Sequence, residues 1–444
     1  MSLARSYRVL TLGCKLNQFD SASIEGQLRR RGFALAAQDA PAGVFVVNTC
    51  TVTENADREA RRLVRRARRE NPGCRLIVTG CYAELDRERL AAMEEVDTVI
   101  GHSDRHRLPE ILDAIAARAE PEGEIACIEA AGDGAALHFG DRTRALLKIQ
   151  EGCDLACSYC IIPKVRGRSR SVPTGDVACV LEALVRRGFR EIVLTGVNAG
   201  DYGKDLVPRT DLVALVRRLL ATPGLGRLRL GSLEPRTVTS GIVELLSAEP
   251  RLAKHLQVPL QSGSDAVLSR MRRNYRTADY RRVLETLREA APTIGLGADV
   301  IVGFPGESDE EFEETCRFVE SSPLNYLHVF SYSDRPGTPA SAMGDPVARG
   351  KVGERSARLR AIGDDLGTAF RRSFVGRRLT VLVLGERRAD GRLRALSDNF
   401  IDLGIEGRDE DMNTFVEAEV LRADAHGAIA RRVRAAADLP AAQA

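Results

Sequence analysis

Three cysteines close together in the middle of the chain have the spacing of a metal site. Cys153, Cys157 and Cys160 follow an apolar run at 145–149, and a strand there would direct three thiols to one point. Thiolates select zinc, Cu(I) or iron–sulfur clusters. Structural zinc sites and ordinary 4Fe–4S clusters take four protein ligands, whereas only three are evident here. The pattern favours a cluster with one iron left open for a substrate; zinc completed by a distant Cys or His is the alternative.

A second group of three cysteines follows the apolar segments of the N-terminal part. Cys14, Cys50 and Cys81 lie at or just after the carboxyl ends of strands that we predict at 7–14, 44–47 and 75–78. Parallel strands lie about 5 Å apart, and ligands bind outside their carboxyl ends in open α/β sheets. We therefore predict a second iron–sulfur site, with burial of core cysteines as the alternative. Four cysteines lack this placement and are predicted to be structural: Cys74, Cys127, Cys179 and Cys316.

The residues around these six cysteines resemble a known family. The Cys-x-x-x-Cys-x-Tyr-Cys run at 153–160 resembles the signature of radical S-adenosylmethionine enzymes. The segments 13–18, 48–53 and 79–82 resemble the three motifs of the methylthiotransferase N-terminal domain. The Gly-Cys-Lys-x-Asn form at 13–17 is similar to the MtaB type, which acts on N6-threonylcarbamoyladenosine in tRNA.

The resemblance implies two 4Fe–4S clusters and S-adenosyl-L-methionine as cofactors. The cluster at Cys153, Cys157 and Cys160 would cleave S-adenosylmethionine by one-electron reduction. The cluster at the N-terminal cysteines would deliver sulfur, and a second cofactor molecule would supply the methyl group. Radical abstraction is required because the C–H bond at adenine C2 is not acidic enough for a side-chain base. No catalytic side chain beyond the cluster ligands is predicted.

The order of the expected elements predicts an α/β fold in three parts. Residues 1–125 are expected to form a doubly wound α/β domain, and 126–143 a linker with a stray strand around 125–128. One helix is expected at 21–31. A second, at 58–70 and capped by Asp57, either contacts phosphates through its arginines or has a solvated basic face. Residues 144–345 alternate six strands with helices, which predicts a partial (β/α)6 TIM-like radical SAM barrel, because eight units would close it. The strands are expected at 144–150, 191–197, 227–232, 255–260, 296–302 and 326–332.

Polar residues of this central domain fall at the carboxyl ends of its predicted strands, where such barrels place their chemistry. The resemblance implies that nine of these central-domain residues contact S-adenosylmethionine. They are Tyr159, Gly196, Asn198, Ser232, Glu234, Gln261, Asp299, Val302 and Gly303. Taken singly, Glu234 is also compatible with a salt-bridged carboxylate, and Gly303 with a plain turn.

The last part of the chain reads as a helix followed by a small all-β domain. A connecting helix is expected within 346–374, and short strands at 379–384, 393–397, 400–405 and 414–423 within a domain at 375–440. Short strands with many arginines suggest an OB-like barrel, and the segment resembles the RNA-binding TRAM domain. Arg377 and Arg378 are its predicted phosphate contacts, and Arg166, Arg168 and Arg170 are those beside the cluster loop. Few aromatic residues are present for base stacking, so binding that does not depend on RNA sequence is expected. The alternative is a barrel that only caps the central domain.

Composition restricts the class of protein further. The chain has 444 residues, a net charge of +3 and ten cysteines. No apolar run is long enough to span a membrane, and residues 1–7 lack the apolar core of a signal peptide, so we expect a cytoplasmic protein. Cysteines in such a chain indicate metal or redox chemistry rather than disulfides.

The function implied by the resemblance is that of a tRNA methylthiotransferase. It would convert N6-threonylcarbamoyladenosine in the anticodon stem-loop to its 2-methylthio derivative, with a flavodoxin-like or ferredoxin-like external electron donor. One alternative keeps the reaction but changes the substrate to isopentenyladenosine in tRNA or to an aspartate of a ribosomal protein. The other is an RNA-binding protein whose iron–sulfur clusters sense redox state.

Overall fold

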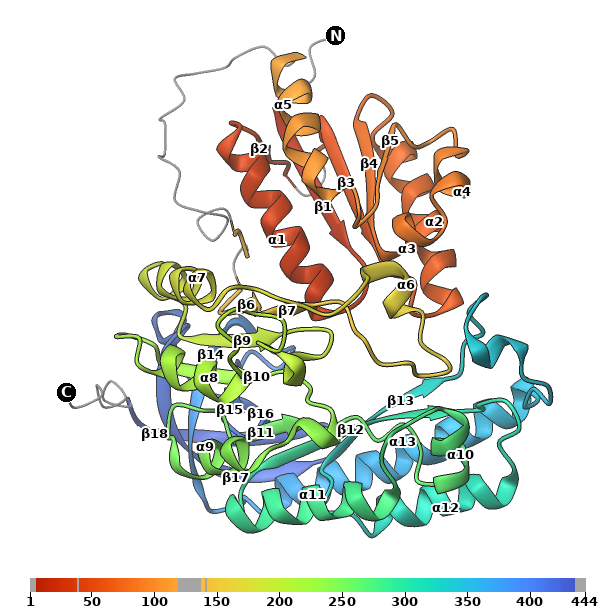
Figure 1. The fold of residues 1–444 in the computed structure, drawn as a ribbon. Helices are drawn as coiled ribbons and strands as arrows, with labels where there is room; N and C mark the ends of the chain where they lie inside the picture. Colours follow the sequence, from red (N-terminus) through yellow and green to blue (C-terminus); the bar gives the residue numbers. More distant parts are fainter. Residues whose placement is uncertain (1–4, 38–39, 119–136, 140–141, 436–444) are drawn as a thin grey trace.

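The protein, described by a computed structural model, folds in three parts that follow one another along the chain (Figure 1). The structure describes residues 5–37, 40–118, 137–139 and 142–435. The strand predicted near 125–128 lies outside these residues, as does Cys127. Within the described residues, no helix combines the length and the apolar character needed to cross a membrane.

The N-terminal part is a five-stranded parallel sheet with the order β2-β1-β3-β4-β5. This is the flavodoxin-like order of doubly wound α/β folds. The central strand β3 is buried at every residue, as expected for a parallel strand covered on both faces. The strands are β1 (Ser6–Thr11), β2 (Ala34–Leu35), β3 (Val44–Thr49), β4 (Arg75–Gly80) and β5 (Thr98–Ile100). The helices are α1 (Lys15–Arg30), α2 (Glu54–Glu70), α3 (Cys81–Leu85), α4 (Arg87–Ala91) and α5 (Leu108–Arg118).

Two helix starts in this part differ from the prediction. The α1 helix begins at Lys15, directly after Cys14, and not near residue 21. The α2 helix begins at Glu54 because the Thr53 hydroxyl caps it, accepting a hydrogen bond from the Ala56 N–H at 3.2 Å. The expected cap, Asp57, is instead buried inside the first turn, where it accepts the Thr51 hydroxyl at 2.6 Å. Prediction of Asp57 as the cap was therefore wrong.

The central part contains six parallel strands in two three-stranded sheets, β10-β9-β6 and β11-β12-β13. A parallel bridge between Ser232 and Gln257 joins the two sheets, so the strands form an arc whose edges are β6 and β13. Each overlaps a predicted strand: β6 (Arg144–Lys148), β9 (Glu191–Thr195), β10 (Arg227–Leu230), β11 (His255–Gln257), β12 (Gly295–Val302) and β13 (Tyr326–Ser331). The helices that follow them are α6 (Ile162–Arg166), α7 (Thr174–Arg186), α8 (Leu212–Leu220), α9 (Ser240–Ala248), α10 (Asp265–Arg270), α11 (Thr277–Ala290) and α12 (Asp309–Glu320).

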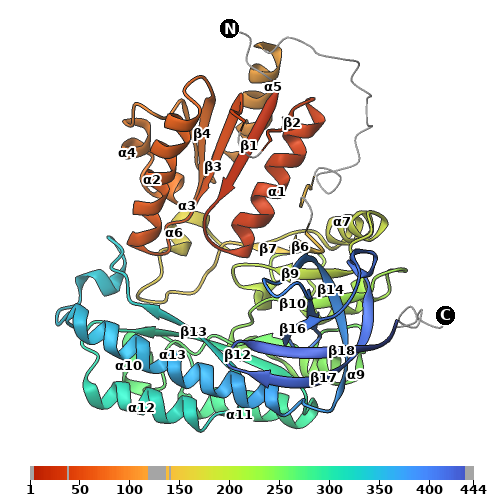
Figure 2. The ribbon, with the colours of Figure 1, turned by 180° about the vertical axis from the view of Figure 1, so that it is seen from behind.

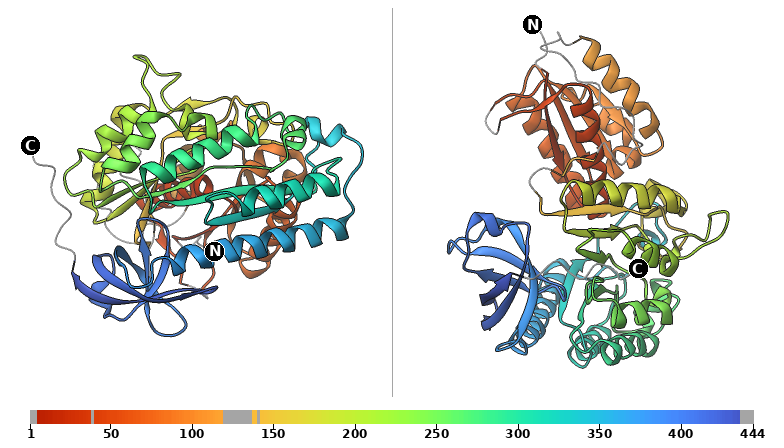
Figure 3. Two further views of the ribbon diagram at one scale, coloured as in Figure 1. Left: turned by 90° about the horizontal axis from the view of Figure 1, so that it is seen from below. Right: turned by 90° about the vertical axis from the view of Figure 1, so that its left-hand side faces the viewer.

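The C-terminal part is a closed barrel with the order β14-β15-β16-β18-β17, reached through the long helix α13 (Arg349–Arg372). Figure 2 shows β17 and β18 in front of the central part in the view from behind, and Figure 3 shows the barrel to one side of it. Its strands are β14 (Arg378–Arg387), β15 (Leu393–Ser397), β16 (Asp402–Ile405), β17 (Phe415–Asp424) and β18 (Gly427–Ala435). The fifth, β18, was not predicted because its alanines and arginines lack a strong β pattern. Pairing of β18 with β16 and β17 closes the barrel.

A buried cluster of charges holds this barrel against β9 and β10. Glu191 is fully buried and lies 2.9 Å from the Arg229 Nε and 3.2 Å from the Arg227 Nη1. Arg229 also donates to the Asp398 carbonyl at 2.8 Å, and Arg227 to the Thr380 carbonyl at 2.9 Å. Burial raises the pKa of Glu191, but the two guanidinium groups outweigh it and hold the pKa at about 2.

Replacing Glu191 by Ala is expected to lower the free energy of unfolding by about 3–5 kcal/mol, since it leaves the buried Arg227 and Arg229 without a carboxylate. The stabilisation from Glu191 is present above its ordinary pKa of 4.5 and is lost as the pH falls toward about 2. Urea unfolding followed by circular dichroism measures both effects. Glu244→Ala, which removes an exposed partner of Arg217, is the control. Equal losses of unfolding free energy in Glu191→Ala and Glu244→Ala would contradict the stabilising role of the buried Glu191.

Candidate active site

The N-terminal cysteine site forms where β1, β3 and β4 end. Cys14 lies between β1 and α1, Cys50 follows β3, and Cys81 begins α3 directly after β4. Gly13 and Gly80 precede two of these cysteines with φ values of 101° and 98°, which favour glycine. A Cβ on Gly13 would lie 2.7 Å from the Cys50 Cβ, so the absence of a side chain permits this close approach. Cys14, Cys50 and Cys81 therefore lie at the same edge of the N-terminal sheet, beyond the carboxyl ends of β1, β3 and β4.

A buried arginine from the central part contacts this site. Arg166 is 3% exposed, and its Nε donates to the Cys81 Sγ at 3.3 Å. Its Nη2 donates to the Asn17 Oδ1 at 2.6 Å, and its Nη1 pairs with Glu151. The guanidinium is therefore enclosed by groups of both domains. This burial contradicts the prediction that Arg166 contacts RNA.

Asp20 is the acidic centre of the contact between the two domains. It is 2% exposed, and its carboxylate lies 2.7 Å from Arg105, 3.1 Å from Lys148 and 3.4 Å from Arg166. Burial acts to raise the pKa of Asp20, but these cations hold it well below its ordinary value. Asp20 and Arg105 were not predicted from the sequence, because their partners are distant in the chain and only the fold brings them together. A second contact supports the same interface: Arg335 pairs with Asp57 at 2.8 Å.

The central cysteine loop is fixed by backbone hydrogen bonds to two distant segments. The Ser158 N–H donates to the Met271 carbonyl at 3.0 Å, and the Ser158 carbonyl accepts the Ala340 N–H at 2.8 Å. Cys153, Cys157 and Cys160 around it are all half-buried. The loop thus presents the three thiols from a rigid turn.

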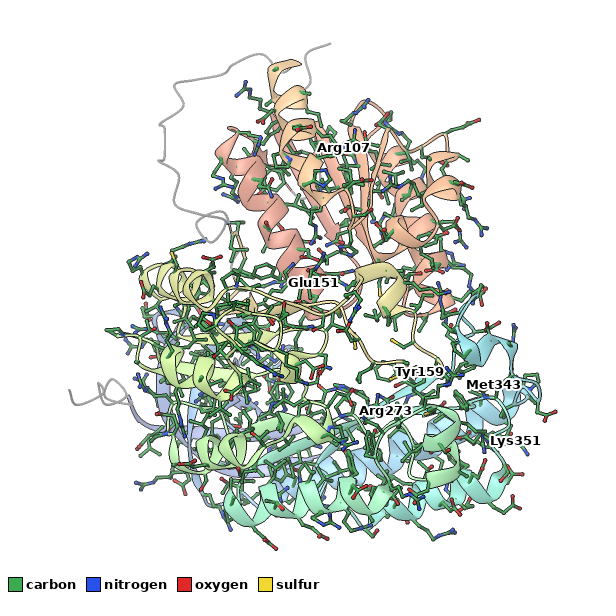
Figure 4. The ribbon with its side chains drawn as sticks, viewed as in Figure 1. Arg107, Glu151, Tyr159, Arg273, Met343 and Lys351 are labelled. Atoms are coloured by element: carbon green, nitrogen blue, oxygen red, sulfur yellow. The ribbon has the colours of Figure 1, made fainter. Side chains whose placement is uncertain are left out.

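A second buried arginine contacts this loop and was not predicted from the sequence. Arg273 donates through its Nη1 to the Cys157 Sγ at 3.0 Å, and its Nη2 pairs with Glu234. Its Nε donates to the Tyr275 hydroxyl at 3.2 Å. Figure 4 shows Arg273 beside Tyr159 at this end of the central part. Each cysteine site therefore has one buried guanidinium on a sulfur.

The predicted cofactor positions lie around the same end of the arc. The Asn198 N–H donates to the Gln150 Oε1 at 2.8 Å after β9, next to Gly196, while the Asn198 Oδ1 is buried without a partner among the described residues. Ser232 lies in the bridge after β10. The carboxylate of Glu234 is engaged by Arg273, as in the salt-bridged alternative.

The remaining positions lie on or beside β12. The Gln261 N–H donates to the Asp299 carbonyl at 2.7 Å, with a φ of 69° at Gln261. Val302 is fully buried, and the Gly303 N–H donates to the Glu307 Oε2 at 2.8 Å. Tyr159 packs against a small core that includes Phe304. Asp299 thus lies within β12, and the other eight positions lie in the cysteine loop or at or after the carboxyl ends of strands.

One short segment connects the two cysteine sites. The Cys153 N–H donates to the Gly167 carbonyl at 3.1 Å. The preceding residue, Arg166, donates to Cys81. Figure 1 shows α6, which ends at Arg166, between the N-terminal strands and the central part. The two sites therefore face a common interface.

Both sites fit thiolate-bound metal centres. Burial raises the pKa of Cys81 to about 12 despite the nearby Arg166, and it raises the pKa of Cys160 to about 12. Burial also lowers the pKa of His102, whose Nε2 lies 3.5 Å from the Cys81 Sγ, to about 3. These thiols need a bound cation to ionise at neutral pH, and a metal centre supplies one. Among the described residues, no three Cys, His, Asp or Glu side chains are grouped for a single ion. Three thiols at each site fit a cluster with one open iron.

The other predicted RNA contacts remain on the surface. Arg168 is exposed and lies 2.8 Å from Asp154, and Arg170 is exposed nearby. Arg377 and Arg378 are exposed at the start of the C-terminal barrel. On α2, Arg68 is paired with Asp97 at 2.6 Å, so not every arginine of this helix is available to bind phosphate.

Comparison with known proteins agrees with the division of the chain. A family model described as Uncharacterized protein family UPF0004 matches residues 6–101, and the Radical SAM superfamily model matches residues 147–319. A threonylcarbamoyladenosine tRNA methylthiotransferase MtaB from Bacillus subtilis is 36% identical over 93% of this chain and 93% of its own length. A tRNA-2-methylthio-N(6)-dimethylallyladenosine synthase from Frankia alni is 39% identical over 95% of this chain and 87% of its own length. The chain belongs to the radical SAM tRNA methylthiotransferases.

The fold of this methylthiotransferase is also found in a solved structure. The radical S-adenosylmethionine methyltransferase TsrM from Kitasatospora setae aligns with a TM-score of 0.53, over 76% of this chain and 74% of its own. The sequences are 15% identical, so the likeness concerns the fold.

Burial of the thiols predicts their reactivity in the iron-free methylthiotransferase. At neutral pH, the thiolate fraction of Cys81 and Cys160 is expected to be about a thousandfold below that of a thiol with the ordinary pKa of 9.0. Iodoacetamide labelling followed by mass spectrometry should therefore modify them much more slowly than the exposed Cys179, with the rate rising as the pH is increased. Labelling of Cys81 as fast as Cys179 would contradict this assignment.

Proposed function

We propose that this methylthiotransferase converts N6-threonylcarbamoyladenosine in the tRNA anticodon stem-loop to its 2-methylthio derivative. MtaB relatives from Bacillus subtilis and Aquifex aeolicus, which are 36% and 35% identical, support this substrate. The observation that carries the reaction is the pair of cysteine sites linked through Arg166 and Gly167. Sulfur insertion needs C–H activation and sulfur delivery at the same carbon, which two sites at one interface allow.

The two sites would hold different clusters. Cys153, Cys157 and Cys160 would bind one 4Fe–4S cluster together with S-adenosylmethionine, and Cys14, Cys50 and Cys81 would bind the second. When bound, these groups supply the radical chemistry and the sulfur that no side chain provides. The protein holds and orients the reactants. Its flavodoxin-like or ferredoxin-like electron donor would act from outside.

The residues around the central site would position the cofactor. Arg273 donates to the Cys157 Sγ and pairs with Glu234, so it fixes a thiol and a carboxylate relative to each other. Tyr159, Gly196, Asn198, Ser232, Glu234, Gln261, Asp299, Val302 and Gly303 are the proposed contacts with S-adenosylmethionine. A polar cofactor group would also satisfy the buried Asn198 Oδ1.

The arc of six strands is proposed to be the partial TIM-like barrel of radical SAM enzymes, and the closed C-terminal barrel to be a TRAM domain. Exposed Arg168 and Arg170 beside the cysteine loop, with Arg377 and Arg378 on the barrel, would contact the RNA backbone. A tRNA substrate supports a cytoplasmic location as part of this proposal.

Single cysteine variants separate the two proposed steps. Cys153→Ala is expected to abolish reductive cleavage of S-adenosylmethionine, because the central cluster loses a ligand. Cys14→Ala is expected to retain cleavage to 5′-deoxyadenosine but to lose methylthiolation of tRNA. Anaerobically reconstituted proteins, incubated with dithionite and the cofactor, supply both measurements by mass spectrometry.

Cys179→Ala is the matched control, since Cys179 is exposed on α7 away from both sites. Methylthiolation by Cys14→Ala at the wild-type rate would refute the two-cluster assignment. No 5′-deoxyadenosine from the wild-type protein would favour an iron–sulfur redox sensor instead.

Nucleoside analysis of tRNA tests the substrate. A strain lacking this gene is expected to lose 2-methylthio-N6-threonylcarbamoyladenosine and to accumulate its precursor, and a plasmid copy should restore the product. The Frankia alni relative, 39% identical, makes dimethylallyladenosine the second candidate. Loss of the methylthio derivative of that nucleoside alone would replace the proposed substrate.

A further inference from the structure

A large cavity lies where all three parts of the protein meet. Its volume is about 650 Å³, within the range of small-ligand sites. Lys15 and Gln18 of α1 line it from the N-terminal part, Arg144 and Val193 from the central strands, and Phe400 from the C-terminal barrel. Figure 1 shows the lower end of α1 directed toward β6. Lys15 follows Cys14 in the chain, so one lining residue of the cavity adjoins the N-terminal cysteine site.

Lys15 differs from the other cations that line this cavity. Arg142 donates to the Gln18 Oε1 at 3.0 Å, and Arg144 and Arg229 pair with Glu191 at 3.5 and 2.9 Å. Lys15 is exposed to the cavity and has no hydrogen-bond acceptor or ion-pair partner among the residues that the structure describes.

Charges of both signs surround Lys15. Arg144, Arg229 and Asp299 act on its charge, and the carboxylates of Glu25 and Glu386 also line the cavity. Asp299 accepts from Gln257 at 2.5 Å and lies 3.1 Å from the His328 Nδ1, and Glu386 pairs with Arg394 at 2.6 Å. Lys15 thus lines the cavity without an ion-pair partner among the described residues and is available to an anion.

The proposed substrate carries an anionic group on the same edge of the base as the carbon that is modified. The threonyl group on N6 of the adenine ends in a carboxylate. C2, where sulfur is inserted, and C6, which carries N6, both flank N1 on one edge of the base. A base whose C2 faces the Cys14 site therefore has its N6 substituent close to residues that neighbour Cys14. The dimethylallyl group of the competing substrate is apolar and offers no charge.

We propose that Lys15 binds the threonyl carboxylate of the substrate nucleoside and so selects it over nucleosides with an uncharged N6 group. This inference rests on the proposed function, because it assumes methylthiolation at adenine C2. A charge-assisted hydrogen bond in a partly enclosed cavity discriminates strongly, since an uncharged group would leave the ammonium unpaired. Lys15 is thus a specificity residue and takes no part in the radical step.

The test uses reconstituted enzyme and three anticodon stem-loop RNAs. One carries N6-threonylcarbamoyladenosine, the second has its carboxylate converted to a carboxamide, and the third has unmodified adenosine. The wild-type enzyme is expected to prefer the carboxylate RNA over the carboxamide RNA by about 10- to 100-fold in kcat/KM, mainly through KM. Fluorescence anisotropy of the same RNAs measures binding without turnover.

Lys15→Gln is expected to remove this preference, and Lys15→Arg to retain most of it. Lys351→Gln is the matched control, because it removes the same charge from α13, where Lys351 pairs with Asp309 outside the cavity. The wild-type comparison between carboxylate and carboxamide does not depend on how any variant folds.

The outcomes separate the two proposals. A wild-type enzyme that cleaves S-adenosylmethionine but modifies none of the RNAs overturns the proposed function. A wild-type enzyme that modifies the carboxylate and carboxamide RNAs equally well overturns the role of Lys15. If Lys15→Gln weakens the binding of all three RNAs equally and lowers the salt dependence of binding, Lys15 contacts an RNA phosphate. That result would also overturn the proposed role of Lys15.

Discussion

The contact between Arg166 and Cys81 is the interaction on which the arrangement of the site depends. A guanidinium that is 3% exposed is costly unless charges surround it, and Asp20, Glu151 and the Cys81 sulfur do so. These groups come from two domains. If the N-terminal domain moved away, Arg166 would lose Asp20 and Cys81 and would keep only Glu151 as a charged partner. These contacts therefore help to hold the two cysteine sites together.

Arg273 has a similar role at the central site, where it lies against a cysteine sulfur as Arg166 does at the N-terminal site. Thiolates close together in a poorly hydrated region repel one another, and burial raises the pKa of Cys153 and of Cys160. A guanidinium on the Cys157 sulfur offsets part of that charge, and its pairing with Glu234 holds it in place. Both cysteine sites thus have a guanidinium group on a sulfur, because each site would gather negative charge away from water.

The other domain contacts keep the cavity between these parts in shape. Glu191 with Arg227 and Arg229 holds the C-terminal barrel on β9 and β10, and Arg335 with Asp57 holds α2 to the loop after β13. These ion pairs engage Arg227, Arg229 and Arg335, whereas Lys15 has no ion-pair partner among the described residues. The cavity that Lys15 lines is formed where the three domains are joined.

The sequence by itself predicted most of the strands and helices and indicated both cysteine trios, because apolar runs and closely spaced cysteines are local signals. Even Cys14, Cys50 and Cys81 were predictable as a group, since parallel strands place their carboxyl ends together. Only the tertiary structure decided the roles of Arg166, Arg273 and Asp20, whose partners are distant in the chain. Arg166 lies in a basic run that reads as an RNA contact, yet its burial makes it a link between domains. Charges acquire their function from what surrounds them, and a sequence does not state those surroundings.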